Sequence, residues 1–400
     1  MKKFQEKNRK LATLSVFFLI PLSGFITDIY LPSFPSMQHA LHTSASDIQL
    51  TLSYYLVSYG VGMFFAGMLV DSFGRYKIVV GALLTFILSC ITIATTRSLP
   101  LIYSMRILQG IAAALAVVGK RAFLVDIYTG KKLRHYTSLL SIVWSMAPIS
   151  APFIGGYLEK AWGWTSNFWF LTGYAMVALV LELLFGGEVL TRFKKFHPAT
   201  IWKAYKEVLG APDFSLGITT LGLGYSMVMI FGMSAPFIIE HQYGLSPVVT
   251  GHCALVSGMG LFIGGIIGKM TAHKPVLGRV ATGLAGAFML AILMYFVLQR
   301  NHSLYVMMAF VLSIHTIEGF IYNIVFTYCL TRFPLHAGIS SGLASGGSYL
   351  VTSLASFVVT RLIFFQEGYQ LSYSYLMLIA ALGCIVFYLH TRRIENMTKV

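Results

Sequence analysis

Residues Leu101 to Ala114 read LIYSMRILQGIAAA, a segment in which Arg106 is the one charged residue. Small and apolar side chains of this kind are typical of helices that pack together inside a membrane. A guanidinium keeps its charge in proteins, and its placement in hydrocarbon costs at least about 3 kcal/mol on insertion scales. Arg106 therefore needs a buried partner or a water-filled cavity, and Asp28 is the best-placed carboxyl in the other apolar segments.

The rest of the chain has the composition of an integral membrane protein. Of its 400 residues, 56% are hydrophobic and 11% are charged, and the mean hydropathy is +0.74. Soluble domains carry about 25% charged residues. Apolar segments of about 20 residues recur from end to end, and each is long enough to cross a bilayer. Because these segments are uninterrupted and rich in Leu, Ala and Gly, they predict helices rather than a barrel.

We predict an all-α membrane protein with twelve transmembrane helices in two pseudo-symmetric bundles of six. The predicted spans are residues 11–35, 49–70, 78–96, 100–122, 137–158, 166–186, 213–240, 248–269, 276–298, 303–328, 337–364 and 369–390. The basic segment 187–212 is the longest connection and separates bundles 11–186 and 213–390 from each other, with tails 1–10 and 391–400. Two such bundles with a site between them are typical of secondary transporters.

The basic residues predict the orientation of the chain. Of the 29 Lys and Arg residues, 24 lie in the tails and in alternate connections, four lie in the other connections, and Arg106 is the remaining one. Since basic loops stay in the cytoplasm, both termini are predicted to be cytoplasmic. The net charge of +15 is divided among short loops, which argues against nucleic-acid binding.

The sequence indicates no enzymatic chemistry. It contains no nucleophile triad or phosphate loop, and the four cysteines form no CxxC or Cys/His ligand set, so we expect no cofactor, metal or direct use of ATP.

Residues 67–79, GMLVDSFGRYKIV, resemble the signature loop between helices 2 and 3 of the major facilitator superfamily. The matching residues are Gly67, Asp71, Gly74, Arg75 and Lys77. Tyr76 replaces a basic residue that is common in this motif, so one of its charges is missing. The resemblance implies the superfamily's fold of twelve helices.

Three further segments resemble this superfamily. Arg106, Gln109 and Gly110 match the Arg motif of helix 4. Residues 147–156, APISAPFIGG, are similar to the helix-bend motif of the antiporters, although alanine replaces two glycines. The helix-bend residues are Pro148, Pro152, Gly155 and Gly156. Residues 28–32, DIYLP, resemble the first helix of the Bcr/CflA-type drug:proton antiporters. That resemblance implies a monomer in a bacterial inner membrane that exchanges a small organic substrate for protons.

Asp28 and Arg106 are the predicted proton-coupling pair. Their positions in the predicted spans place both roughly 10 Å below the outer end of the bilayer, so the two charges can meet. A buried carboxyl facing a guanidinium can load and release a proton. The alternative is a static pair that locks the fold.

Glu318 is a second deep acid, and it lies three residues after His315, on the same helix face. It is either a further proton-coupling or substrate-binding carboxyl or a satisfied structural acid. Since no second HxxE pair exists, a metal site is not expected.

The predicted cytoplasmic gate consists of Gly67, Asp71, Gly74, Arg75 and Asp126. In this hypothesis Arg75 contacts Asp126, and Asp71 holds the N-terminus of span 11, where the helix dipole favours a carboxylate. Ordering of the loop alone is the alternative.

Aromatic and methionine side chains suit bulky, variable ligands. The candidates for the substrate cavity are Tyr30, Tyr54, Tyr55, Tyr59, Met146, Tyr225, Met229, Phe237, His315, Tyr322 and Asn323. The sequence as a whole predicts a proton-coupled exporter of small organic compounds that confers multidrug efflux. The alternatives are an exporter of one native metabolite such as a siderophore, a proton-driven importer, and a sensor built on a transporter fold.

Overall fold

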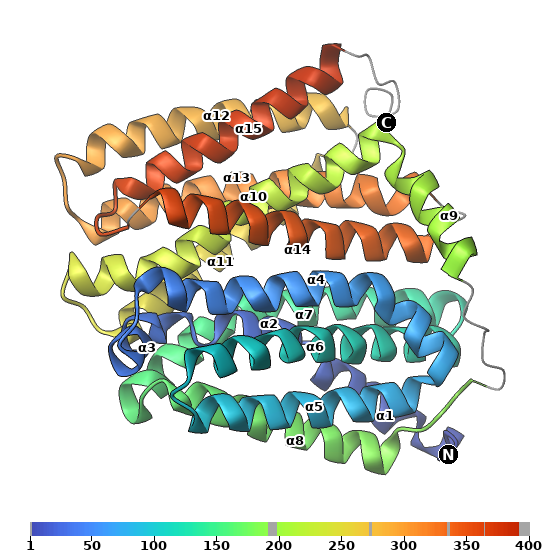
Figure 1. Ribbon diagram of the computed structural model, residues 1–400. Helices are drawn as coiled ribbons and strands as arrows, with labels where there is room; N and C mark the ends of the chain where they lie inside the picture. The colour runs from blue at the N-terminus through green and yellow to red at the C-terminus, as the bar shows by residue number, and fades with distance from the viewer. Residues whose placement is uncertain (1, 191–197, 272–273, 334–336, 364, 392–400) are drawn as a thin grey trace. The chain divides into compact units, whose positions relative to one another are not determined.

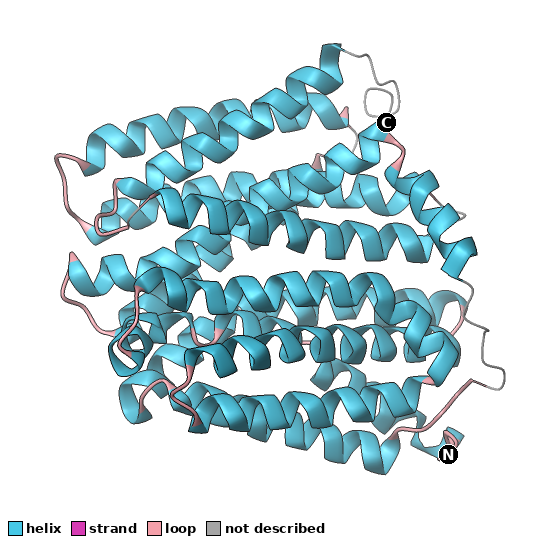
Figure 2. Ribbon diagram, in the orientation of Figure 1, coloured by secondary structure: helices cyan, strands magenta, loops and turns pink. Residues whose placement is uncertain are grey.

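The computed structural model describes residues 2–190, 198–271, 274–333, 337–363 and 365–391, and these residues are almost wholly helical (Figure 2). The chain divides into two compact units, Met1–His197 and Pro198–Val400.

The first unit begins with a broken helix and continues with five long helices (Figure 1). Its elements are η1 (Glu6–Asn8), α1 (Arg9–Leu19), α2 (Leu22–Asp28), η2 (Leu31–Ser33), α3 (Phe34–Leu41), α4 (Ala45–Phe73), α5 (Arg75–Thr95), α6 (Leu99–Ile127), α7 (Gly130–Trp162) and α8 (Thr165–Phe185). Within the unit, α6 packs along α4 and α5, and α5 also packs along α8.

The second unit begins with a short helix that is followed by six long ones. Its elements are α9 (Pro198–Leu209), α10 (Pro212–His241), α11 (Pro247–Met270), α12 (Val276–Leu298), α13 (Leu304–Arg332), α14 (Ala337–Leu362) and α15 (Gln370–Thr391). Helix α13 packs most closely on α11, because Gly264 leaves room for the backbone carbonyl of Thr316. Helices α12 and α10 also pack on α13, and α14 packs along α10.

Eleven helical segments in the described part of the chain are long and apolar enough to cross a membrane. They correspond to every predicted span except 137–158. That segment lies in α7, which is long enough to cross a bilayer, but several of its side chains lie outside the described part of the structure.

Two predicted segments differ from the structure. The first span does not end near residue 35, because the helical path continues to Leu41. The basic connection 187–212 is not wholly a loop, because it contains α9. Hydropathy does not reveal α9, which is too short to span a bilayer; Pro198 at its first position is a usual helix start.

The first helical path is interrupted at three prolines. Pro21 precedes α2, Pro32 lies in η2, and Pro35 lies in the first turn of α3. Each proline lacks a backbone N–H and removes one bond of the helical ladder, which favours a break at these positions. Because α2 ends at Asp28, the last carbonyls of α2 are left for side-chain donors.

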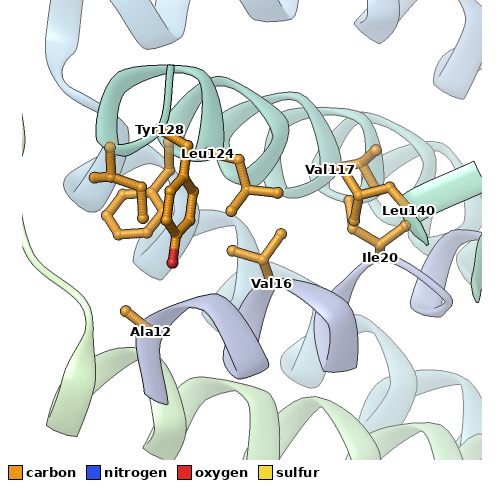
Figure 3. Close-up of a cluster of buried hydrophobic side chains, with 9 residues drawn as sticks. Ala12, Val16, Ile20, Val117, Leu124, Tyr128 and Leu140 are labelled. Atoms are coloured by element: carbon orange, nitrogen blue, oxygen red, sulfur yellow. The ribbon is translucent and has the colours of Figure 1, made fainter. Parts of the chain in front are cut away.

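A buried apolar cluster fixes α1 against α6 and α7 in the first unit (Figure 3). Its labelled members are Ala12, Val16, Ile20, Val117, Leu124, Tyr128 and Leu140. The hydroxyl groups of Thr13 and Tyr128 are 2.9 Å apart and add a buried hydrogen bond between α1 and α6. This cluster anchors the helix that leads into the broken segment around Asp28.

The helix-bend motif seats that broken segment against α7. Helix α7 continues through Pro148 and Pro152. Gly24 of α2 lies against Ala147 and Pro148, and Gly155 lies so close to the carbonyl of Ile29 that a Cβ would collide with it. The absence of a side chain at Gly155 therefore sets the position of the backbone directly after Asp28.

We predict that Gly155→Ala destabilises the protein by about 1–3 kcal/mol, the usual cost of overpacking a filled interior. Thermal melting of the purified protein in detergent measures the effect. Gly173→Ala on α8 is the matched control, because a Cβ there meets nothing within 4 Å. Equal melting temperatures for the two variants would contradict the close contact.

Candidate functional site

Arg106 lies on α6 and is completely buried. Its Nη1 donates to Oε1 of Gln109 at 2.9 Å, and its Nη2 donates to the hydroxyl of Tyr30 at 3.0 Å. Longer bonds run from Nη2 to the carbonyl of Ile26 (3.4 Å) and from Nε to the carbonyl of Thr51 (3.3 Å). The planar fork of a guanidinium matches this spread of acceptors, which a lysine does not.

Two tyrosine rings also contact the guanidinium. Its central carbon lies 4.5 Å from the ring centroid of Tyr30 and 4.8 Å from that of Tyr55. Such contacts contribute about 2 kcal/mol each when the cation is desolvated. Tyr30 is fully buried and its hydroxyl also lies 3.1 Å from that of Thr51. In this structure Tyr30 therefore positions Arg106, and its place in a substrate cavity stays a prediction.

The expected ion pair between Asp28 and Arg106 is not present, although the structure describes both side chains. Asp28 is only 4% exposed, and its Oδ2 has no hydrogen-bond partner. The prediction was wrong because Arg106 satisfies its donors with carbonyls, an amide and a phenol. The sequence could not predict that the carbonyl of Ile26 accepts a bond from Arg106. This carbonyl is available because α2 ends two residues later.

The lack of an ion-pair partner affects the charge that Asp28 can carry. A carboxylate that is buried without a cation or a full set of donors pays a large desolvation cost. The surroundings of Asp28 therefore suit a protonated, neutral carboxyl. The guanidinium of Arg106, in contrast, is surrounded by neutral oxygens and by ring faces.

Glu318 has the same character in the second unit. It lies on α13, is 1% exposed, and neither of its carboxylate oxygens has a hydrogen-bond partner. His315, one turn earlier, is 2.7 Å from the hydroxyl of Ser257 through Nδ1 and 3.2 Å from that of Tyr375 through Nε2. Both ring nitrogens of His315 are thus engaged, and no ion pair joins the described Glu318 and His315 side chains.

Arg75 organises one end of the first unit. Its side chain forms ion pairs with Asp71 (3.3 Å) and Asp126, and it donates to the carbonyl of Ala122 at 2.8 Å. Gly74 has φ 97°, a conformation that favours glycine, and it ends α4 directly before Arg75. The predicted Arg75–Asp126 contact is therefore present. A Cβ at the predicted gate residue Gly67 meets nothing within 4 Å.

Sequence reasoning missed a buried ion pair in the same unit. Lys120 of α6 and Glu182 of α8 are 1% and 3% exposed and form an ion pair, to which the hydroxyl of Ser15 adds a contact at 3.2 Å. Both residues lie within the predicted spans 100–122 and 166–186, near the ends of these spans, and only tertiary packing brings the two side chains together.

Glu188 was also missed. Its carboxylate accepts a hydrogen bond from the backbone N–H of Tyr76 at 3.1 Å, which satisfies one of the free donors at the start of α5. Its backbone pairs with that of Lys2 and Phe4. No simple pattern in the sequence links residues so far apart.

The predicted substrate-cavity residues fall into groups of different exposure. Tyr55, Tyr59, Met229, Phe237 and His315 are buried, Tyr225, Tyr322 and Asn323 are partly buried, and Tyr54 is 37% exposed. The rings of Tyr225 and Tyr322 lie 6.0 Å apart in the second unit. The side chain of Met146 lies outside the described part of the structure.

Buried charged groups inside bundles of spanning helices define a class of protein, the polytopic membrane transporters. The family model of the Major Facilitator Superfamily matches residues 16–356, and the chain belongs to this superfamily. It is a multi-pass membrane transporter of small substrates, in a family of transporters rather than enzymes.

Among curated relatives, the chain is similar to a chloramphenicol resistance protein of Pseudomonas aeruginosa, with 30% identity over 72% of this chain and 68% of that one. It is also similar to a bicyclomycin resistance protein homologue of Haemophilus influenzae, with 29% identity over 53% of this chain and 56% of that one. Its fold resembles the crystal structure of a bacterial homologue of the human lysosomal transporter Spinster, with a TM-score of 0.74 and 15% identity over 99% of both chains.

Proposed function

We propose that this protein is a proton-coupled exporter that exchanges small organic compounds, including drugs, for protons, and that it works as a monomer. The observation that carries the proposal is Asp28, a buried carboxyl without an ion-pair partner beside a fully bonded Arg106. The names of the Pseudomonas and Haemophilus relatives, which refer to chloramphenicol and bicyclomycin resistance, support export of drugs.

The coupling follows from two states of Asp28. With the proton bound, the carboxyl is neutral and tolerates burial, and Arg106 stays with Tyr30, Gln109 and the carbonyls. When the proton leaves, the carboxylate needs a counter-charge in a medium of low dielectric constant, and Arg106 of the Arg motif on α6 is proposed to supply it. Loss of the proton therefore favours a rearrangement around α2, and substrate binding is expected to favour the same deprotonated state.

Everted membrane vesicles that contain the protein test the proposed function. Respiration acidifies their lumen, so an antiporter releases protons from the lumen when chloramphenicol is added outside. A proton-driven importer moves protons and substrate in the same direction, and a sensor moves neither. Absence of proton movement with chloramphenicol and with a panel of other drugs and metabolites would contradict the proposal.

The ion pairs of Arg75 are proposed to hold a gate at the cytoplasmic surface. Asp71 would bind the N-terminus of span 11, and residues 334–336, which directly precede that span, lie outside the described part of the chain. We predict that Asp71→Asn slows turnover and changes substrate affinity less, because only the gate loses a charge. Transport rates and binding, measured at matched expression, check this. Unchanged turnover would show that Asp71 and its loop, residues 67–79, contribute packing only.

The orientation is also a proposal, with both termini in the cytoplasm of a bacterial cell. In a background without the four native cysteines, a cysteine at Lys132 should react only with reagents that reach the inner side. Cysteines at Ser98 and His302 should react from outside. Outside labelling at Lys132 would reverse the proposed topology.

A further inference from the structure

We propose that Glu318 is a second proton-binding carboxyl, loaded independently of Asp28, so that each exchange cycle moves two protons, one through each unit. The inference rests on the proposed antiport. It adds a proton site on α13 and sets the number of protons that a drug displaces.

The first support is the isolation of the Glu318 carboxyl. It is 1% exposed, and neither oxygen has a hydrogen-bond partner. A structural acid would be expected to bond to neighbouring donors, because an unpaired buried polar group is costly. Glu318 is thus not the satisfied structural acid that the sequence left as an alternative. A bound proton removes the charge and most of that cost.

The second support is the space that α10 leaves for this carboxyl. A Cβ at Gly224 would collide with both oxygens of Glu318. Glycine at this position of α10 therefore admits the head group, which touches backbone instead of a polar side chain. Because no hydrogen bond holds the carboxyl there, it can leave this site at the cost of packing contacts alone.

The third support is the absence of an internal counter-charge among the described residues. Five helices contact α13, one of them α15 through Tyr375. Their ionisable groups are Asp213, Tyr225, Glu240 and His241 on α10, His252, Cys253 and Lys269 on α11, Arg279 and Tyr295 on α12, Tyr349 and Arg361 on α14, and Tyr373, Tyr375, Cys384, Tyr388 and His390 on α15. Those on α13 itself are Tyr305, His315, Tyr322, Tyr328, Cys329 and Arg332. None forms a hydrogen bond or ion pair with Glu318 in the described structure.

The basic side chains on these helices either bind other groups or are exposed. Arg332 pairs with Asp213, and Arg279 donates to the carbonyl of Gly268 at 3.3 Å. The exposed basic residues are Lys269, Arg361, His241, His252 and His390. The His315 ring is engaged by Ser257 and Tyr375. A proton from water is therefore the counter-charge available to Glu318.

The proton balance is simple. Water on the outer side gives a proton to the Glu318 carboxylate, which becomes a neutral acid and is enclosed against Gly224. After the conformational change the acid returns the proton to water on the inner side, and the carboxylate is restored. The same transfer occurs at Asp28, so two protons enter for each drug exported.

The test counts protons released by purified, full-length protein in weakly buffered detergent solution at mildly acidic pH when chloramphenicol is added. The wild type is expected to release two protons per bound drug, Glu318→Gln and Asp28→Asn one each, and the double variant none. Glu318→Asp, which keeps a carboxyl, should restore the count to two. Glu240→Gln, at the end of α10, is the matched control and should also release two.

The outcomes separate the two proposals. Two protons released by a folded Glu318→Gln variant would overturn the second site while leaving antiport intact. An undiminished count in both single variants would overturn antiport through Asp28 as well. If Glu318 instead binds an organic cation, Glu318→Gln will lose tetraphenylphosphonium binding but keep the full proton count with chloramphenicol, which also overturns this inference. Gly224→Ala, which crowds the carboxyl without removing it, should lower the count even if Glu318→Gln does not fold.

Discussion

Asp28→Asn is expected to weaken uphill drug export severely while the protein remains folded and still exchanges drug down a gradient. Asparagine has nearly the shape of the protonated carboxyl, and the buried site already accommodates a neutral group. An amide cannot take up or release a proton, so drug binding and the pH gradient become uncoupled at this residue. Everted vesicles measure both modes, with a pH gradient for uphill export and preloaded drug for downhill exchange.

Asp28→Glu is the control for this variant, because it keeps a titrating carboxyl at nearly the same place. It should retain part of the uphill export. Full uphill export by Asp28→Asn, at matched expression and melting temperature, would exclude Asp28 as a coupling residue.

Arg106→Ala is expected to remove export and to destabilise the first unit by about 3 kcal/mol. The variant leaves the amide oxygen of Gln109 and the carbonyls of Ile26 and Thr51 without their donor. Each unsatisfied buried group costs about 1–3 kcal/mol. It also removes the counter-charge that a deprotonated Asp28 needs, so the deprotonated state becomes less accessible.

Arg106→Lys separates charge from geometry. Lysine keeps the positive charge but lacks the planar fork that reaches Tyr30, Gln109 and the carbonyls together. We expect better folding than in Arg106→Ala and export that remains impaired. Thermal melting and vesicle transport, measured side by side, check this. Full export by Arg106→Lys would show that charge alone suffices and that the hydrogen-bond fork has no role in coupling.

Sequence patterns predicted the helical class and the superfamily because both depend on local properties. Apolar segments long enough to cross a bilayer mark the spans, and short motifs such as residues 67–79 mark the family. The pairing of Arg75 with Asp126 was also predictable, since a family motif contains the arginine and both residues lie near span ends.

The partner of Arg106 was not predictable, because it depends on where a helix ends. Equal depth in idealised spans suggested a pair with Asp28, but the breaks near Pro21 and Pro32 change the path of the first helix. Lys120 and Glu182 were missed for a related reason. Both lie near the ends of predicted spans, where tertiary packing decides whether a polar side chain is buried.

The most direct test of the central claim, that drug and proton exchange through Asp28, is proton release by purified protein. Unbuffered wild-type protein should release protons when chloramphenicol binds, and folded Asp28→Asn should release one fewer for each drug bound. Equal release by the two proteins, with equal drug binding and equal melting temperatures, would contradict the assignment of the proton to Asp28.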